Sequence, residues 1–147
     1  MLHAGYIVLA DRYIYTAFAR DAVRGCNRDW IRRLYSYARQ PDVTFFFDVP
    51  LEIALERILA GRPQLKFHEA GMDIGFSNDP YESFRIFQGK INEEYQRMIG
   101  EYDFVTVDAT RPPDIQQPAI RRILEDRIDL AKFRWRGPAH LQQSSVV

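Results

Sequence analysis

Three runs of mainly apolar residues without regular polar alternation predict buried strands. They cover residues 6–10, 43–49 and 104–108. A strand that is covered on both faces carries apolar side chains in both directions, whereas a half-exposed strand alternates. Such runs are typical of parallel strands in α/β proteins. We therefore expect the three segments to lie in one parallel sheet.

Apolar residues at helical spacing fill the stretches between and after these strands. Side chains that recur every three to four residues form one face of a helix. Alternation of strands with helices requires a parallel sheet with right-handed crossovers. The expected fold class is therefore α/β, a three-layer parallel sheet with helices on both faces. The predicted helices cover residues 14–23, 29–38, 50–59, 81–99 and 115–131, with Asn27 as N-cap of the second and Pro118 tolerable only in the first turn of the last.

Helical periodicity stops between residues 60 and 80, where glycines and prolines interrupt the chain. A loop of this length inside a compact domain often has a function, and lids over active sites are a frequent case. We expect this lid to belong to a single domain over residues 1–131. A flexible tail over residues 132–147 is expected to follow.

Bulk composition and charge narrow the classes of function. The chain has 147 residues and a formal net charge of zero, so no bulk attraction to nucleic acid or to an anionic membrane is expected. Cys26 is the only cysteine, which excludes an internal disulfide framework and a cysteine-based zinc site. No apolar run of membrane-spanning length and no signal-peptide pattern is present. These features predict a cytoplasmic protein that binds neither nucleic acid nor membrane.

A carboxylate and a guanidinium follow the first predicted strand directly. Asp11 and Arg12 would lie at the carboxyl edge of the sheet, where open α/β sheets bind their ligands. The planar fork of an arginine binds phosphate oxygens, and an aspartate can hold Mg²⁺ or its water ligands. The pair therefore indicates phosphate chemistry, with a surface ion pair at a strand end as the alternative.

Four blocks of the sequence resemble the successive blocks of the thymidylate kinase family. They are residues 11–13 with Thr16, residues 41–49, residues 81–84 and residues 108–110, with an arginine-containing helix and lid after the second block. The resemblance covers about residues 5–125 in the family's order. It implies phosphoryl transfer from ATP with Mg²⁺ to a nucleoside monophosphate, dTMP being the default acceptor, on a P-loop nucleoside monophosphate kinase-like fold.

The resemblance also implies roles for individual residues. Arg12 would bind the acceptor phosphate, and Asp11 would be catalytic beside the Mg²⁺ ion and that phosphate. Arg57 and Arg62 would be lid arginines that position the transferring phosphoryl group and neutralise its charge. The other implied residues are Tyr13, Thr16, Arg20 and Asp21 for acceptor binding and Asp108, Ala109 and Thr110 for the adenine of ATP.

One departure from the family pattern concerns recognition of the base. The family has a Tyr-Gln pair a few residues beyond Thr16 that recognises the thymine ring, and Arg20 and Asp21 occupy those positions here. A charged pair cannot reproduce an aromatic stack and the two-way hydrogen bonding of an amide. The acceptor is therefore open between dTMP, another nucleotide and some other phosphorylated or acidic molecule.

A second departure concerns the phosphate-binding loop, or P-loop. Such a loop needs glycine-rich backbone that ends in Gly-Lys-Ser/Thr at a helix N-terminus. The only Gly-Lys pair is Gly89-Lys90, which lies inside a predicted helix and is followed by Ile91. In the family this loop comes upstream of the Asp-Arg block, after the first strand. We expect a C-terminal portion of the family fold, truncated at its N-terminus, that does not turn over alone.

The absent first strand has a structural consequence. The sheet order that the resemblance implies is 2-3-1-4-5, so the strands visible here would be the third, fourth and fifth. Residues 6–10 and 43–49 would then pair directly or leave their inner edges unpaired, at a cost on the order of 1–3 kcal/mol for each unpaired buried group. We expect a compromised or rearranged fold, with a homodimer through these edges as one solution.

Two hypotheses from other classes of function stay open. The first is a non-catalytic kinase-like module that binds a nucleotide or a partner protein. The second is nucleic-acid binding near the C-terminus, for which the neutral net charge supplies little attraction. The residues concerned are Arg122, Arg127, Lys132, Phe133, Arg134, Trp135 and Arg136.

Overall fold

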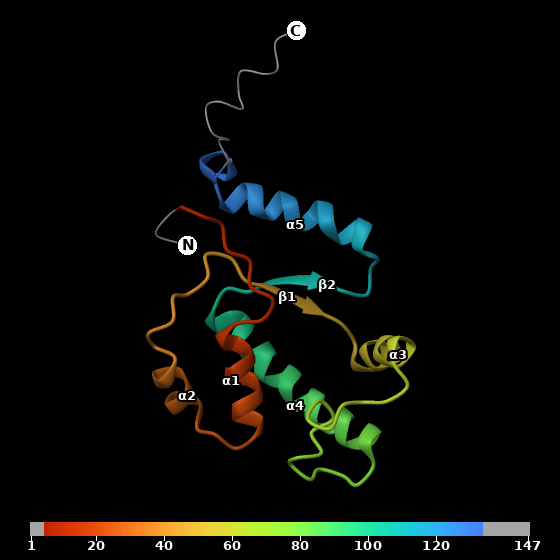
Figure 1. Ribbon diagram of the computed structural model, residues 1–147. Coiled ribbons are helices and arrows are strands. Elements are labelled where there is room, and N and C mark those ends of the chain that lie inside the picture. Colours follow the sequence, from red (N-terminus) through yellow and green to blue (C-terminus); the bar gives the residue numbers. More distant parts are fainter. Residues whose placement is uncertain (1–4, 134–147) are drawn as a thin grey trace, which may run out of the picture.

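The computed structural model describes residues 5–133, so residues 134–147 of the predicted tail lie outside the described residues. Each predicted helix is present, with ends shifted by a few residues (Figure 1). The elements follow in the order α1 (Ile14–Val23), α2 (Arg28–Leu34), β1 (Phe45–Asp48), α3 (Leu51–Gly61), α4 (Pro80–Glu101), β2 (Val105–Asp108), α5 (Pro113–Arg127) and the 3₁₀ helix η2 (Leu130–Phe133).

Strands β1 and β2 pair in parallel and form the sheet of the described residues. Asp48 lies opposite Asp108, so both strands deliver a carboxylate to the same edge. The backbone N–H of Ala109 donates to the carbonyl of Asp48 at 2.8 Å and continues the pairing past the strand end. Because α3 and α4 connect the two strands, the arrangement confirms the mixed α/β class in a small form.

Residues 6–10 form no strand, which shows that the strand prediction for this segment was wrong. Their apolar side chains are exposed, from 46% for Ile7 to 88% for Leu9. A strand needs a neighbour that satisfies its backbone groups. Strand β1 has β2 as its neighbour in the part of the chain that the structure describes, and its other edge does not pair with this segment. The composition of residues 6–10 favours a strand, but no described segment of the chain pairs with them to form one.

The apolar core lies around α4, which is the longest helix of residues 5–133. Phe87 is fully buried in this core, and α1 packs against α4 through Tyr15 and Phe18. The aromatic rings of Tyr15 and Phe104 meet edge to face with their centroids 4.7 Å apart. The core thereby fixes α1 against the start of β2.

Helix α2 is held to α4 by ion pairs. Glu94 accepts hydrogen bonds from Arg28 at 2.8 and 2.5 Å, and the side chain of Glu94 is only 11% exposed. The hydrogen bonds from Arg28 lower the pKa of Glu94 against the effect of burial. Asn27 caps α2 as predicted, because its side chain accepts from the backbone N–H of Trp30 at 3.0 Å. Helix α2 is therefore held against α4.

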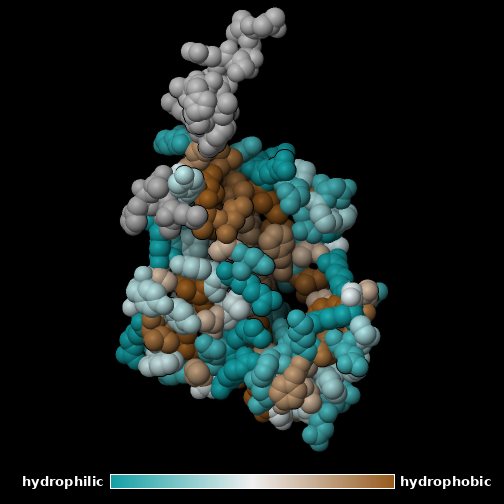
Figure 2. Space-filling view, viewed as in Figure 1, coloured by the Kyte–Doolittle hydropathy of each residue, from teal (hydrophilic) through white to brown (hydrophobic). Residues whose placement is uncertain are grey.

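In Figure 1, α1 and α4 lie on one side of the two strands, and α5 lies on the other side. No residue of α5 is buried, and Figure 2 shows apolar side chains gathered on the surface at the level of the strands and α5. Pro118 lies in the second turn of α5, not in the first turn as predicted. An exposed helix tolerates this proline because water can satisfy the carbonyl that loses its partner. Across residues 5–133, no helix is long and apolar enough to cross a membrane.

Candidate functional site

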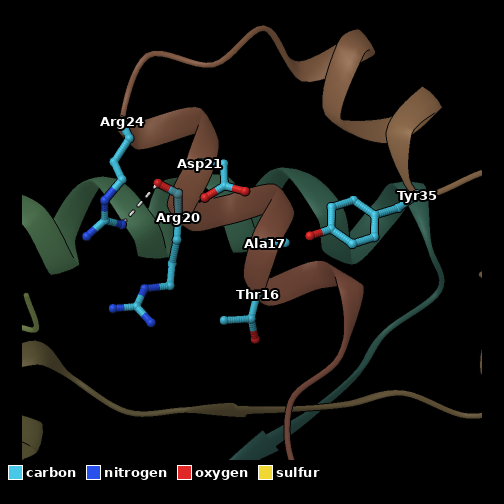
Figure 3. A pocket seen from close by; sticks show the side chains of 6 residues that line it. All are labelled: Thr16, Ala17, Arg20, Asp21, Arg24 and Tyr35. Atoms are coloured by element: carbon cyan, nitrogen blue, oxygen red, sulfur yellow. Dashed lines mark hydrogen bonds between the residues drawn. The ribbon is translucent and has the colours of Figure 1, made fainter.

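A pocket of about 420 Å³ opens on one face of α1. Its lining residues on α1 recur at helical spacing, so one side of the helix forms its floor. Figure 3 shows Ala17 in the middle of this floor, with longer polar side chains around it. Three of the predicted acceptor-binding residues therefore share one depression. The lining consists of Thr16, Ala17, Arg20, Asp21, Arg24 and Tyr35.

Thr16 connects this pocket with β1 and α4. The hydroxyl of Tyr95 on α4 donates a hydrogen bond to Thr16 Oγ1 at 3.2 Å. The ring of Tyr95 also stacks on Phe46 of β1, with the centroids 5.3 Å apart. The N-terminal end of the pocket is thus fixed to the sheet through a single tyrosine.

Arg24 connects the other end of the pocket with the loop of residues 62–79. Its guanidinium forms an ion pair with Asp73 at 3.2 Å and lies 4.8 Å from the ring centroid of Phe87. Burial raises the pKa of Asp73, but the hydrogen bond from Arg24 and nearby positive charge outweigh it, and the net shift is downward. The His68 Nδ1 lies 3.7 Å from the Asp73 carboxylate and contributes to that charge. The loop is therefore fastened at the rim of the pocket.

Asp11, Arg12 and Tyr13 lie just before α1, outside the residues that line the pocket. Arg12 has a φ of 68°, a left-handed conformation that non-glycine residues rarely adopt. This backbone turn carries the chain from the extended segment into α1, and both Asp11 and Arg12 are exposed there. The hydroxyl of Tyr13 donates to the carbonyl of Arg39 at 3.0 Å, so this side chain holds the start of α1 to the chain after α2.

Arg57 lies at the other predicted site, the loop after β2. From α3 it donates hydrogen bonds to the carbonyls of Ala109 at 2.7 Å and Thr110 at 3.2 Å. Asp108 accepts from the backbone N–H of Thr110 at 2.9 Å and from its hydroxyl at 2.5 Å. The hydroxyl bond, the N–H bond and the charge of Arg111 hold the pKa of Asp108 below its ordinary value. These contacts give the loop a defined shape.

Arg62 lies immediately after α3 and forms an ion pair with Glu69 inside the loop of residues 62–79. The carbonyl of Glu69 also accepts from the side chain of Gln88 on α4 at 2.9 Å. Arg57 and Arg62, which the resemblance groups as lid arginines, therefore have different partners. One of them contacts the loop after β2, and the other holds the lid loop itself.

The residues fit an Mg²⁺ ion that is bound mainly through phosphate. Mg²⁺ usually keeps several waters and takes only one or two protein carboxylates when a nucleotide supplies phosphate oxygens. The exposed carboxylate of Asp11 can serve in that way. No cluster of three or more His, Cys, Asp or Glu residues that could hold a metal by itself occurs within residues 5–133. In the loop of residues 108–110, which is predicted to lie near the adenine of ATP, the backbone groups already have partners. The N–H groups of Ala109 and Thr110 donate to Asp48 and Asp108, and their carbonyls accept from Arg57.

Three pocket residues, Ala17, Arg24 and Tyr35, were not predicted from the sequence. Arg24 lies one helical turn beyond Arg20, so extending the α1 face by that spacing would have found it. Tyr35 approaches from a separate helix, and no local pattern links it to α1. Its position depends on the ion pairs that fix α2.

Comparison with known proteins gives a consistent result. The family model described as thymidylate kinase matches residues 1–120. A relative from Saccharolobus solfataricus, named probable thymidylate kinase 2, is 45% identical over 130 residues, which are 88% of this chain and 61% of the relative. A probable thymidylate kinase from Methanosarcina mazei is 33% identical over 128 residues, covering 82% of this chain and 56% of that protein.

More distant relatives show the same partial coverage. A probable thymidylate kinase from Methanocaldococcus jannaschii is 28% identical over 104 residues, which are 71% of this chain and 46% of the relative. The chain thus spans roughly half to three-fifths of the length of these curated relatives.

Proposed function

The chain belongs to the thymidylate kinase family, and we propose that it carries the acceptor site, the lid and the adenine loop of a nucleoside monophosphate kinase. In this proposal ATP with Mg²⁺ is the phosphoryl donor, and a nucleoside monophosphate, dTMP by default, is the acceptor. The observation that carries the proposal is that Thr16, Arg20 and Asp21, all predicted as acceptor-binding, line one pocket on α1.

Arg12 is proposed to bind the acceptor phosphate. It lies one helical turn before Thr16, at the N-terminal end of α1, so a monophosphate could place its base in the pocket and its phosphate near Arg12. The helix N-terminus adds favourable partial positive charge at that end. Asp11 precedes Arg12 and is proposed to hold Mg²⁺ or its waters beside the same phosphate. The bond from Tyr13 to Arg39 keeps this end of α1 in place.

The donor side of the proposal uses the two arginines in different ways. Arg57 fixes the carbonyls of Ala109 and Thr110 and is proposed to keep the adenine loop in shape. Arg62 is proposed to neutralise charge on the transferring phosphoryl group, for which its ion pair with Glu69 has to open. Opening of that pair would accompany movement of the loop of residues 62–79.

We propose that the 147-residue chain binds nucleotide without turning it over. Phosphoryl transfer needs a cradle of backbone N–H groups and a lysine around the donor phosphates, and the sequence has no Gly-rich loop ending in Gly-Lys-Ser/Thr. A groove of about 180 Å³ lies between residues 46–49 and side chains of α3 and α4. In the sheet order that the resemblance implies, a strand carrying that loop would lie between β1 and residues 6–10.

Calorimetric titration of the purified chain with the four deoxynucleoside monophosphates tests the acceptor site. We expect at least one of them to bind, and we expect an Arg12→Ala variant to bind it about tenfold more weakly because a charge-assisted phosphate contact is lost. Arg121→Ala on the exposed α5 is the matched control and should bind as the unmodified chain does. ADP formation from ATP should stay at background.

The alternatives predict other outcomes. If a folded chain bound none of the monophosphates, the proposed acceptor site would be wrong, and a non-catalytic module with a different ligand would be favoured. Equal binding by the Arg12→Ala variant would leave the pocket as the acceptor site but show that Arg12 does not bind the acceptor phosphate. Measurable ADP formation that depends on a monophosphate would contradict the proposal that the chain does not turn over alone.

A further inference from the structure

The α1 pocket contains two charged side chains of opposite sign with unused hydrogen-bonding groups. Arg20 and Asp21 both line the pocket and are both partly buried. The hydrogen bonds between Arg20 and Arg24 use the backbone carbonyl of Arg20, which accepts from the backbone N–H of Arg24 at 3.2 Å and from its guanidinium at 3.4 Å. Within residues 5–133, neither the guanidinium of Arg20 nor the carboxylate of Asp21 has a hydrogen-bond or ion-pair partner. Two groups of high hydrogen-bonding capacity thus face a cavity large enough for a nucleobase.

Helix geometry sets where these groups meet a ligand. Arg20 and Asp21 lie three and four residues beyond Ala17, so their side chains flank the space above Ala17 from two directions. Figure 3 shows the side chains of Arg20 and Asp21 leaving α1 in different directions, with the hydroxyl of Tyr35 pointing toward Ala17 from the opposite side. The methyl group of Ala17 leaves room for a flat ring on the helix surface. A planar ligand there would meet a donor on one edge and an acceptor on another.

Arg20 and Asp21 each match a ligand edge that carries two adjacent hydrogen-bonding groups. An arginine fork offers two parallel N–H donors, and an ionised carboxylate offers two oxygens that only accept. Guanine matches both, because its O6 and N7 form one pair of adjacent acceptors and its N1–H and 2-amino group form one pair of adjacent donors. Thymine has a single N–H between two carbonyls, so the second oxygen of Asp21 would face a carbonyl oxygen. Adenine and cytosine offer one amino group without a second adjacent donor.

We infer that Arg20 and Asp21 select a guanine nucleotide as the acceptor, with Arg20 on the O6/N7 edge and Asp21 on the N1/2-amino edge. This inference rests on the proposed function, because it takes the α1 pocket as the base site. It replaces the default acceptor of the family by a base whose edges fit the two charged side chains. Arg20 and Asp21 then determine the specificity for the base, and Arg12 binds the acceptor phosphate as proposed above.

Competition between dGMP, dTMP and dIMP on the 147-residue chain tests the inference. dIMP lacks the 2-amino group of dGMP and keeps every other contact, so the ligand is changed and the protein is not. We expect dGMP to bind about tenfold tighter than either dTMP or dIMP, as expected for one good bidentate contact. An Asp21→Asn variant should bind dGMP and dIMP equally, whereas Asp126→Asn on the exposed α5 should keep the difference.

The outcomes separate this inference from the proposal beneath it. If dTMP bound as tightly as dGMP, or if loss of the 2-amino group had no effect, guanine selection would be wrong while the acceptor site stood. A preference for dGMP that persisted in Asp21→Asn would remove Asp21 from the recognition. If no monophosphate bound to the folded chain, the proposed function would fail and the inference with it.

Discussion

The loop of residues 62–79 and the segment of residues 5–12 both lack helices and strands, yet they are held very differently. The loop is fastened at several points: Arg24 binds Asp73, Gln88 binds the carbonyl of Glu69, and Gly71 lies against Phe87. The segment exposes the apolar side chains of Tyr6, Ile7, Val8 and Leu9. Of these two irregular segments, the loop is the one that long-range contacts hold in place.

The comparison also concerns function. The fastened loop carries Arg62 and is attached to the α1 pocket through Arg24. A change in the position of Arg24 in the pocket should therefore alter how the loop is held. The unfastened segment leads directly to Asp11 and Arg12, which the proposal needs near the acceptor phosphate. Completion of the phosphate site thus depends on the less constrained of the two regions.

Among substitutions in the two compared regions, the largest effect is expected from Gly71→Ala in the fastened loop. Gly71 has a φ of 68°, and a Cβ placed there would lie 2.6 Å from the Phe87 ring. Backbone strain and overpacking against a fully buried ring should together lower the free energy of unfolding by about 2–4 kcal/mol. Denaturant titration would measure this change.

Gly75→Ala is the matched control for this substitution. Gly75 has a φ of 77°, but nothing lies within 4 Å of a Cβ placed there. Only backbone strain of about 1 kcal/mol is expected. Equal losses in the two variants would show that the contact with Phe87 does not anchor the loop.

A smaller effect is expected from Asp73→Asn, which removes the charge that Arg24 binds. The loss should be about 0.5–1 kcal/mol, as is usual for a partly exposed pair. Because the pKa of Asp73 is lowered in the folded chain, its contribution is present above the unfolded pKa of about 3.9 and is lost as pH falls through the folded pKa. The difference in the free energy of unfolding between the unmodified chain and Asp73→Asn should therefore disappear at acidic pH. A difference independent of pH would contradict the role given to this carboxylate.

The smallest effect is expected in the unfastened segment. Leu9 is 88% exposed, so Leu9→Ser should change the free energy of unfolding by less than about 0.5 kcal/mol. Ile31→Ser is the opposite case, since Ile31 is 1% exposed and its truncation should cost several kcal/mol, about 2–5. A loss of similar size in Leu9→Ser would mean that residues 5–12 pack against something in solution.

Local signals in the sequence predicted most of the helices and the parallel pairing. Helical spacing placed α1 at its observed bounds, and Asn27 was recognised as an N-cap from its residue type and position. The strand predicted over residues 6–10 failed because a strand requires a paired neighbour, which composition cannot supply. Pro118 was expected in the first turn because the helix was predicted to begin at residue 115, whereas α5 begins at Pro113.

The candidate site was predictable to the extent that its residues share one element. Thr16, Arg20 and Asp21 lie on one helix face, so their convergence follows from spacing alone. The contacts of Arg57 with the carbonyls of Ala109 and Thr110 join residues more than fifty positions apart, and no short-range pattern encodes them. The catalytic role expected for Arg57 remains a prediction beside this structural contact.

Native-state hydrogen exchange of the 147-residue chain tests the contrast between the two regions most directly. The backbone N–H groups of Ala70, Met72 and Ile74 donate hydrogen bonds inside the loop, at 2.9, 3.2 and 3.0 Å. We expect these amides to exchange slowly and the amides of residues 6–10 to exchange at the rates of an unstructured peptide. Slow exchange across residues 6–10 together with fast exchange in the loop would contradict the account, because the segment would then be paired and the loop would be free.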